Sequence, residues 1–319
     1  MGKILITSSH FETLCQSAWE LLKQNGHELV IHKGPLPYMS FEEIAAVIGD
    51  IDGAIIGLDN WTNEVFEIAP KLKVVAKFGV GLDNIDKESA KKKSIKVINA
   101  PGINSNAVAE LVIGFMIDML RQITNLNNSL KNGQWVRFTG NEVKGKTIGL
   151  LGFGSIGQLV AKKLQGFDAE VLASDLYPNK EIAQKYNVTI CSSDDVLSRS
   201  DIVSIHIPST PSTYHMMNDE VFGKMKQGSY IINAARGALV DAEALIRALE
   251  TGKIAGAALD TYEVEPLNMG DPILSNDQII CTPHTGGETK ETYHKVSLSV
   301  AQGVIDALSG KEPANWQNP

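Results

Sequence analysis

The chain has 319 residues, of which 43% are hydrophobic, and it carries a formal net charge of −8 at pH 7. A chain of this length normally divides into two domains, each with a core of its own. The acidic charge argues against nucleic acid as a partner, because a phosphate backbone calls for a basic protein surface.

The start of the chain and its cysteines indicate the compartment. The N-terminal segment lacks the long apolar stretch of a secretory signal, and no apolar run reaches the length of a membrane-spanning helix. Cys15, Cys191 and Cys281 are far apart and odd in number, which suggests neither a disulfide framework nor a metal site. We therefore expect a cytoplasmic protein with no membrane partner and no bound metal.

The first hundred residues alternate short apolar runs with amphipathic segments, a pattern typical of a parallel sheet with crossover helices. After the first strand, a helix is expected to end at Gly26 and to carry on one face Leu14, Ala18, Leu21 and Leu22. Together these elements predict a first α/β domain of flavodoxin-like character. Its strands are expected at residues 4–7, 53–56, 74–76 and 97–99.

A long apolar helix follows the interruption at Pro101-Gly102. Ser105 or Asn106 can cap this helix, which continues through Met119. Its apolar residues lie on more than one side, so we expect it to pack against two partners, of which one can be a second subunit. The polar stretch 125–146, with Trp135 and Phe138 as isolated aromatic anchors, is predicted to be an irregular arm or linker.

A second α/β unit begins at Thr147. A last helix, about 288–308, can return to the first domain and make it discontinuous. The predicted domains are therefore 1–101 together with 286–319, and 102–285. Apolar runs predict the strands of the second domain at 147–151, 170–174, 202–206, 230–233, 256–259 and 278–281.

A glycine loop, Gly152-Phe153-Gly154-Ser155-Ile156-Gly157, lies between the first strand of this second unit and a helical pattern. In a dinucleotide-binding turn Gly152 makes the tight turn, Gly154 lets a pyrophosphate approach the backbone, and Gly157 permits close contact of helix and strand. The N–H groups at the helix start, together with the helix dipole, favour the pyrophosphate. The context of strand, loop and helix predicts a Rossmann domain.

Asp175 stands 18 residues after Gly157, at the end of the next predicted strand. A carboxylate there can accept hydrogen bonds from the adenosine ribose and would repel a 2′-phosphate. Leu176 and Tyr177 supply no arginine to attract that phosphate, so NAD is favoured over NADP. The alternative is a glycine-rich turn beside an incidental surface aspartate.

Arg236, Glu265 and His284 each follow a predicted strand of the domain that carries the glycine loop. Ligands of α/β sheets bind at these strand ends. An arginine can bind a carboxylate through two parallel hydrogen bonds, and a glutamate bound to an imidazole fixes its tautomer for proton transfer near neutral pH. A lone arginine more often forms a surface salt bridge and a lone histidine is more often structural, but the shared position of the three favours a catalytic site.

The chain resembles the NAD-dependent D-2-hydroxyacid dehydrogenases over nearly its whole length. The resemblance implies two Rossmann-like domains, with a catalytic domain made from both chain ends, an NAD-binding domain from the middle, and a cleft between them. It also implies a homodimer joined largely through the NAD-binding domain. The matching segments are 79–86, 104–110, 152–157 with Asp175, 201–208, 233–237, 259–266 and 284–287.

The same resemblance implies a role for single residues. Arg236 would bind the substrate carboxylate and carbonyl, and His284, with Glu265 as its partner, would donate the proton in reduction and accept it in oxidation. The backbone N–H groups of Val80 and Gly81 would bind the substrate carboxylate. The residues implied along NAD are Ser155 and Ile156 over the pyrophosphate, Asp260 and Ala234 at the nicotinamide amide, Gly286 closing the pocket, and also His206, Pro208 and Ala235.

The substrate is less well defined by the sequence. The motifs look most like the 3-phosphoglycerate dehydrogenase branch, in a short form without a regulatory domain. That branch uses an arginine after an early strand to bind phosphate, whereas residues 55–62 contain no basic residue and carry Asp59. Lys77, just before the loop Gly79-Val80-Gly81, is the cation nearest to that loop. Glyoxylate, hydroxypyruvate or a larger 2-keto acid, with Trp61 or Tyr38 lining the pocket, are the alternatives.

Two related groups of proteins have other functions. Formate dehydrogenases of this superfamily carry glutamine where this chain has Glu265, and formate oxidation releases no hydroxyl proton, so that branch is disfavoured. Transcriptional co-repressors that resemble the family bind NAD as docking platforms and can retain Arg236, Glu265 and His284. Turnover of 2-keto acids separates an enzyme from such a binding protein.

Overall fold

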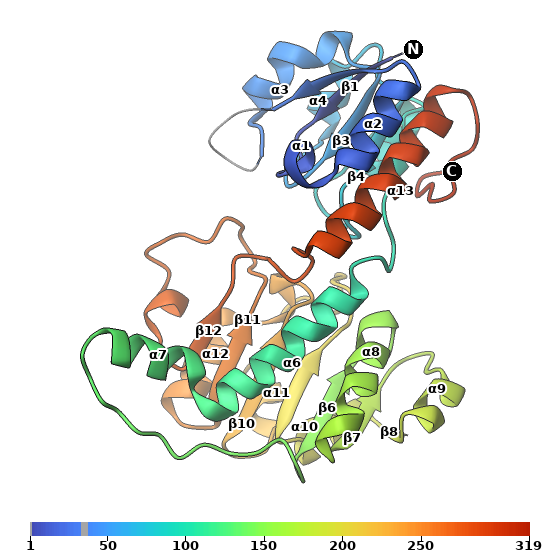
Figure 1. Ribbon diagram of the computed structural model, residues 1–319. Helices are drawn as coiled ribbons and strands as arrows, with labels where there is room; N and C mark the ends of the chain where they lie inside the picture. Colours follow the sequence, from blue (N-terminus) through green and yellow to red (C-terminus); the bar gives the residue numbers. More distant parts are fainter. Residues whose placement is uncertain (1, 33–37) are drawn as a thin grey trace. The chain divides into compact units, whose positions relative to one another are not determined.

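The computed structural model describes residues 2–32 and 38–319. The chain divides into two compact units, Met1–Asn104 with Gly287–Pro319 and Ser105–Gly286 (Figure 1). The sequence placed these boundaries after residues 101 and 285. Within the described residues, no helix is both long and apolar enough to span a membrane, and no group of three or more potential ligands could hold a metal ion.

The first unit is built on a parallel sheet whose described part has five strands in the order β2-β1-β3-β4-β5. This is the flavodoxin-like order of the doubly wound α/β fold. The strands are β1 Lys3–Ile6, β2 Glu28–Ile31, β3 Gly53–Ile56, β4 Val74–Lys77 and β5 Lys96–Ile98. The helices are α1 Phe11–Leu14, α2 Gln16–Gln24, α3 Phe41–Val47, α4 Asn63–Glu67, α5 Lys87–Lys92 and α13 Lys290–Leu308, with a 3₁₀ turn at Ile48–Asp50.

Hydrophobic clusters on the two faces of this sheet contain different helices. On one face, α13 lies against α2 and contacts β3 and β4, so the C-terminal helix belongs to the core of the first unit. The other face is covered by side chains of α3, α4 and α5. The second cluster includes Trp61, which is fully buried and packs beside Phe66.

The expected helix at the start of the chain is interrupted. Cys15, with φ −115° and ψ 37°, leaves the helical conformation and separates α1 from α2. Leu14 therefore does not lie on the apolar face of α2 and is exposed, whereas Ala18 and Leu22 are buried as expected. The helix ends before Gly26, whose φ of 79° is the left-handed turn that a glycine allows.

The second unit contains, in its described residues, a seven-stranded parallel sheet in the order β12-β11-β10-β9-β6-β7-β8. The direction of winding reverses between β6 and β9, where Rossmann folds bind dinucleotides. The strands are β6 Thr147–Leu151, β7 Glu170–Ser174, β8 Val188–Ile190, β9 Ile202–Ile205, β10 Ser229–Asn233, β11 Ile254–Leu259 and β12 Ile279–Cys281. The helices are α6 Ser105–Arg121, α7 Ile123–Lys131, α8 Ser155–Leu164, α9 Lys180–Lys185, α10 Ser193–Arg199, α11 Asp219–Lys224 and α12 Ala242–Glu250, and 3₁₀ turns lie at Gln165–Phe167, Gly237–Leu239 and Pro272–Ser275.

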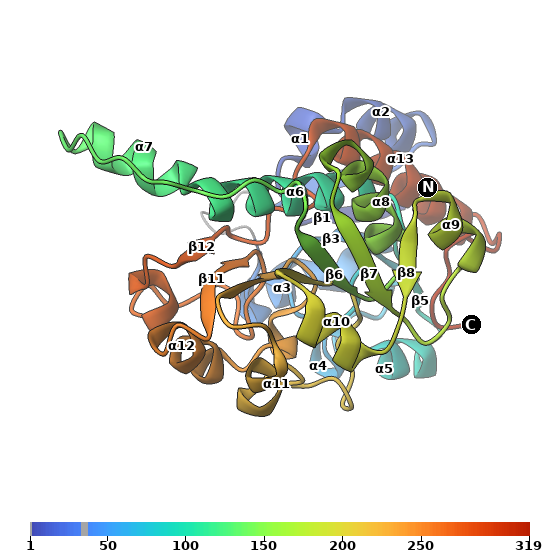
Figure 2. The ribbon, with the colours of Figure 1, turned by 90° about the horizontal axis from the view of Figure 1, so that it is seen from below.

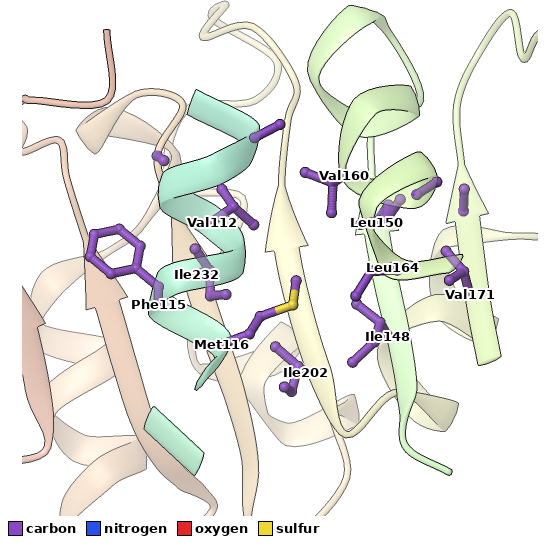
Figure 3. Packing of buried hydrophobic residues seen from close by; sticks show 14 of the residues in the cluster. Val112, Phe115, Met116, Ile148, Leu150, Val160, Leu164, Val171, Ile202 and Ile232 are labelled. Carbon is purple, nitrogen blue, oxygen red and sulfur yellow. The ribbon is translucent and has the colours of Figure 1, made fainter. Parts of the chain in front are cut away.

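The long helix α6 packs against α8 and against the sheet (Figure 3). Val112 and Met116 lie in one cluster with Val160 and Leu164 of α8. These two partners within its own unit account for the apolar residues on more than one side of the helix. The helix begins at Ser105, so Ser105 and Asn106 are its first helical residues. Neither is therefore the cap that precedes the helix.

The segment after α6 differs from its prediction. Residues 123–131 form the helix α7, whereas the whole stretch 125–146 was expected to be irregular, and α7 contains no buried residue. The following residues 134–143 have neither helix nor strand, and Trp135 is 84% exposed, so it does not anchor the segment. Figure 2 shows α7 and this stretch projecting from the sheet of the second unit. We refer to residues 123–143 as the arm.

Candidate active site

The glycine loop connects β6 to the start of α8, at the point where the sheet reverses direction. Gly152 has φ 100°, and a Cβ there would lie 2.6 Å from the carbonyl oxygen of His206. A Cβ on Gly157 would lie 2.4 Å from the carbonyl oxygen of Gly152, whereas the Cβ position of Gly154 is open. Two glycines thus permit tight packing, and the third leaves space above the backbone for a pyrophosphate. Ser155 and Ile156 form the first turn of α8, where N–H groups are free to bind an anion.

Asp175 lies just beyond β7 and is bonded to the glycine loop. Its Oδ2 accepts a hydrogen bond from the N–H of Phe153 at 2.7 Å, and its Oδ1 accepts one from Tyr177 at 2.8 Å. These two contacts hold the carboxylate beside the loop, and each oxygen keeps a lone pair for a ribose hydroxyl. The position suits the adenosine side of NAD.

His206 follows β9 and packs beside the glycine loop. Its Nε2 is buried and has no hydrogen-bond partner among the described residues. Burial lowers the pKa of His206 to about 4, so the imidazole is neutral near pH 7. A buried polar atom without a partner usually has one in the functional state. Its place next to Gly152 and Gly157 fits a cofactor bound at this loop.

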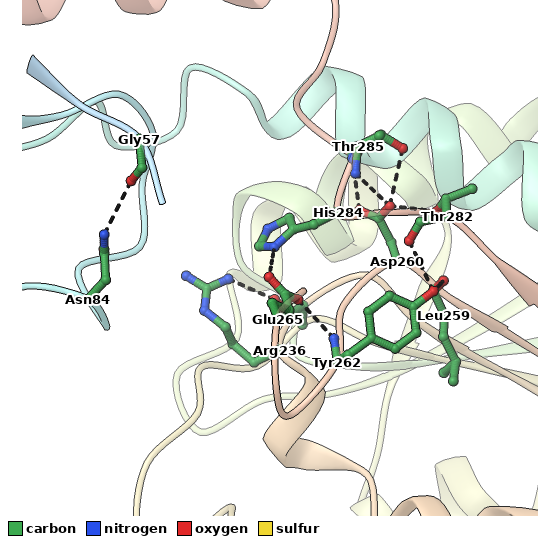
Figure 4. A network of polar contacts seen from close by, with 12 residues as sticks. Gly57, Asn84, Arg236, Leu259, Asp260, Tyr262, Glu265, Thr282, His284 and Thr285 are labelled. Carbon is green, nitrogen blue, oxygen red and sulfur yellow. Dashed lines mark hydrogen bonds and ion pairs between the residues drawn. The ribbon is translucent and has the colours of Figure 1, made fainter. Parts of the chain in front are cut away.

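Glu265 and His284, two of the candidate catalytic residues, are in direct contact within the second unit (Figure 4). The Nδ1 of His284 lies 2.7 Å from the Oε2 of Glu265, and the Oε1 of Glu265 accepts the N–H of Tyr262 at 2.9 Å. Burial acts to raise the pKa of Glu265, but the hydrogen bond and charge of His284, the Tyr262 N–H and the charge of Arg236 together hold that pKa below its usual value. The ionised glutamate fixes a proton on Nδ1 of His284, so its Nε2 is the atom that can exchange a proton with a substrate.

Asp260 is hydrogen-bonded to residues on both sides of this histidine. His284 has φ 54°, a left-handed conformation that costs a non-glycine residue about 1–2 kcal/mol. The buried Asp260 carboxylate accepts hydrogen bonds from the N–H groups of Thr285 and Gly286, both at 2.8 Å, and from the hydroxyl of Thr282 at 2.6 Å. These bonds offset the strain and direct the imidazole toward Glu265. The position of Asp260 was expected near the nicotinamide, and this supporting role was not foreseen.

Arg236 follows β10, and Figure 4 shows its side chain beside Glu265. The turn that carries it is shaped by Asn233, a buried residue at the end of β10. The Asn233 amide donates to the carbonyl oxygen of Arg236 at 2.8 Å, and its oxygen accepts the N–H of Ala235 at 3.1 Å. The positive charge of Arg236 also contributes to the low pKa of Glu265. These catalytic candidates therefore converge in one unit.

Some residues that build the site were missed from the sequence. Asn233 and Thr282 shape the turns next to Arg236 and His284, and Tyr262 positions Glu265 through its backbone N–H. The available signal was a polar residue directly at the end of an apolar strand. Of the other residues expected along NAD, Ala234 and Gly286 are buried and Pro208 is exposed.

Val80, Gly81 and Lys77 belong to the first unit, at and after the end of β4. The Nζ of Lys77 donates a hydrogen bond to Asn84 Oδ1 at 3.0 Å and another to the carbonyl oxygen of Gly57, which places a cation at the loop after β3. The carbonyl oxygen of Val80 accepts the amide of Asn99 at 2.7 Å. The role of these three residues in binding substrate stays a prediction.

Two interpretations of the loop after β3 change. Trp61 is fully buried in the core of the first unit, so it does not line a substrate pocket, whereas Tyr38 is half-buried. Asp59 is also buried, and its carboxylate accepts the N–H of Met39 at 2.6 Å and the hydroxyl of Thr7. Asp59, whose presence in this loop argued against a phosphate site, thus has a structural role.

The chain is similar to known proteins over most of its length. Residues 113–286 match the family described as "D-isomer specific 2-hydroxyacid dehydrogenase, NAD binding domain". A glyoxylate reductase of Thermofilum pendens is 39% identical, over 90% of this chain and 87% of the relative. A D-3-phosphoglycerate dehydrogenase of Methanocaldococcus jannaschii is 38% identical over the whole chain, which spans 60% of that relative. The TT0316 protein from Thermus thermophilus superposes with a TM-score of 0.90 at 32% identity, covering 98% of this chain and 99% of that one.

The chain belongs to the D-isomer specific 2-hydroxyacid dehydrogenase family. The expected cofactor, NAD, and the expected enzyme class, an oxidoreductase acting on the CH–OH group of its donor, are confirmed by this membership. The expected fold of two parallel-sheet α/β domains is confirmed as well.

Proposed function

We propose that the chain interconverts a D-2-hydroxy acid and its 2-keto acid with Arg236, Glu265 and His284 as its catalytic residues. The observation that carries the proposal is the 2.7 Å contact between His284 Nδ1 and Glu265 Oε2, beside Arg236 and within the unit that holds the glycine loop. When bound, NAD supplies or accepts the hydride at the substrate carbon. The protein supplies position, a proton and charge stabilisation.

In the direction of reduction, the guanidinium of Arg236 binds the carboxylate of the keto acid and polarises the neighbouring carbonyl. The Nε2 of His284 donates its proton to the carbonyl oxygen, which becomes the hydroxyl of the product. The Glu265 carboxylate keeps its hydrogen bond to Nδ1 throughout and stabilises the imidazolium before the proton leaves. Oxidation follows the same steps in reverse, with His284 as the base.

The first candidate substrate pair is 3-phosphoglycerate and 3-phosphohydroxypyruvate. The support is the similarity to phosphoglycerate dehydrogenases together with the cation of Lys77 at the loop after β3. The second candidate is glyoxylate or hydroxypyruvate. It is favoured by the absence of a basic residue in positions 55–62. It is also favoured by the similarity to a glyoxylate reductase, of whose length the chain covers 87%.

A panel of glyoxylate, hydroxypyruvate, pyruvate and phosphohydroxypyruvate tests both levels of the proposal. We expect oxidation of NADH with at least one of these keto acids, and at least a tenfold preference for NADH over NADPH because of Asp175. Phosphohydroxypyruvate preferred over hydroxypyruvate by about tenfold in kcat/KM, or about 1.4 kcal/mol, supports the first candidate. Equal or reversed values select the second, and no oxidation with any member refutes the function.

We also propose that the protein is a homodimer joined through the arm. Large apolar side chains are exposed along it, namely Ile123, Leu130, Trp135, Val136 and Phe138. Exposed apolar side chains gathered in one segment mark an association surface. The arm is tied to its own unit by the Asn125 amide, which donates to the carbonyl oxygen of Asp277 at 3.1 Å, so it can present these side chains to a second copy.

Sedimentation of a Trp135→Ser/Phe138→Ser variant tests the dimer. We expect the wild type to sediment at twice its 34.5 kDa mass and the variant to shift toward the monomer as concentration falls, because both substitutions remove apolar contact area. Tyr177→Ser is the control, since Tyr177 is also an exposed aromatic residue but lies outside the arm. A wild-type monomer, or a variant as dimeric as the control, rejects the proposal.

A further inference from the structure

Tyr214, His215 and Glu263 form a polar cluster that the proposed chemistry does not use. The Tyr214 hydroxyl donates to Glu263 Oε1 at 2.6 Å, and His215 Nε2 lies 2.9 Å from Glu263 Oε2. The two rings are stacked with centroids 3.9 Å apart and 14° between their planes. Two neighbouring residues thus each bind one oxygen of the same carboxylate, so this carboxylate makes two contacts where the usual surface ion pair makes one.

The same segment is fastened to the turn after Arg236. The backbone N–H of His215 donates to the carbonyl oxygen of Ala238 at 2.8 Å, and that of Met217 donates to Leu239 at 3.0 Å. His215 itself has a left-handed backbone conformation, with φ 47°. The loop after β9 is therefore bonded to the loop after β10, which carries Arg236.

The loop after β11 packs on the same turn. A Cβ on Gly237 would lie 1.9 Å from the carbonyl carbon of Tyr262 and 2.3 Å from the nitrogen of Glu263, so only glycine fits beside this peptide. The peptide between Tyr262 and Glu263 directly follows the Tyr262 N–H, and this N–H donates a hydrogen bond to Glu265. A displacement of Glu263 would therefore move the group that positions Glu265.

The charge of the cluster is consistent with a permanent connection. The hydrogen bonds from Tyr214 and then from His215 hold the pKa of Glu263 below its usual value. The carboxylate is thus ionised throughout the neutral range and remains an acceptor for both partners. Burial opposes this effect only weakly, because much of the Glu263 side chain is exposed.

We propose that Tyr214 and His215 are positioning residues, which through Glu263 hold the loop after β11 so that Glu265 meets His284. The cluster joins three loops from adjacent strands β9, β10 and β11, and two of these loops carry Arg236 and Glu265. This inference rests on the proposed function, because it assigns a task to residues that support the same catalytic pair.

The variants Glu263→Gln and His215→Gln test the inference by kinetics. We expect kcat to fall by about 10- to 100-fold, since a small misplacement of catalytic groups is costly, with KM and NADH affinity changed less than about twofold. Glu263→Asp, which keeps the charge, is expected to recover part of kcat. Glu243→Gln is the matched control, because Glu243 is an exposed carboxylate of the same unit that pairs with Arg247 on α12.

A second readout does not depend on turnover. The downfield proton NMR signal of the His284 Nδ1–H, assigned by its loss in His284→Asn, reports the bond to Glu265 directly. We expect it to broaden or shift in Glu263→Gln and His215→Gln and to stay unchanged in Glu243→Gln. An unchanged signal together with an unchanged kcat overturns the inference. A fall in thermal stability large enough to account for the loss of kcat overturns it as well. Wild-type protein inactive toward all keto acids refutes the proposed function instead, and the NMR result then decides the inference alone.

Discussion

Replacement of His284 by asparagine is expected to lower kcat/KM for keto-acid reduction by about 10²- to 10⁴-fold, the range that general acid catalysis contributes. Asparagine tolerates the left-handed backbone of this position, so the loop keeps its conformation. It cannot deliver the proton that the imidazole passes from Nε2 to the carbonyl oxygen. Steady-state kinetics together with a fluorescence titration of NADH measure both effects, and NADH affinity is expected to stay unchanged.

His294→Asn is the control for this experiment. His294 is an exposed histidine on α13 in the other unit, so the same chemical change there is expected to leave the rate within about twofold of the wild type. If His284→Asn retains the wild-type rate, or loses NADH binding in the same proportion as activity, His284 is not the proton donor.

The second large effect is expected at Arg236. Arg236→Gln should lower kcat/KM by about 10²- to 10³-fold, because it removes the donors that bind the substrate carboxylate and polarise the carbonyl. Arg236→Lys should recover only part of this loss, since an ammonium group cannot form two parallel hydrogen bonds to a carboxylate. Kinetics over a range of keto-acid concentrations separate the effects on KM and kcat.

Arg247→Gln provides the comparison, because Arg247 also makes a two-point contact with a carboxylate, that of Asp219 on the neighbouring helix α11. Its loss is expected to change the rate little, since exposed ion pairs of this kind contribute weakly. Full activity of Arg236→Lys would show that a positive charge suffices, and unaltered kinetics of Arg236→Gln would remove the residue from the mechanism.

Most strands of both sheets, including the edge strands β5 and β12, could be predicted from the sequence, and two edge strands could not. Residues 53–56 and 147–151 were placed as the structure has them, because buried parallel strands appear as continuous apolar runs. The edge strands β2 and β8 were missed, and both are poorly buried, with no buried residue in β2 and one in β8. The helix α7 was also missed. Ile123, Leu126 and Leu130 do recur at helical spacing, but they lie in a stretch that is otherwise polar, and the helix buries no residue in this chain.

The catalytic candidates could be found because parallel strands bring their carboxyl ends to one edge. That rule placed Arg236, Glu265 and His284 after β10, β11 and β12, which are neighbours in the sheet. It says nothing about which polar groups hold the loops together. The bonds of Asp260 to residues 282–286 and of Glu263 to Tyr214 depend on turn geometry, which the order of residues does not reveal.

The buried carboxylate of Asp59 restricts how this protein could evolve toward phosphorylated substrates. A mutation of Asp59 to arginine would leave the Met39 N–H and the Thr7 hydroxyl without their acceptor, at a cost of about 1–3 kcal/mol for each buried group, and would bury a cation in their place. Leu58 and Asn60, on either side, are exposed and have no such task. A lineage that gains affinity for phosphate at this loop would therefore reach it through the neighbours of Asp59, with the aspartate retained as part of the inherited scaffold.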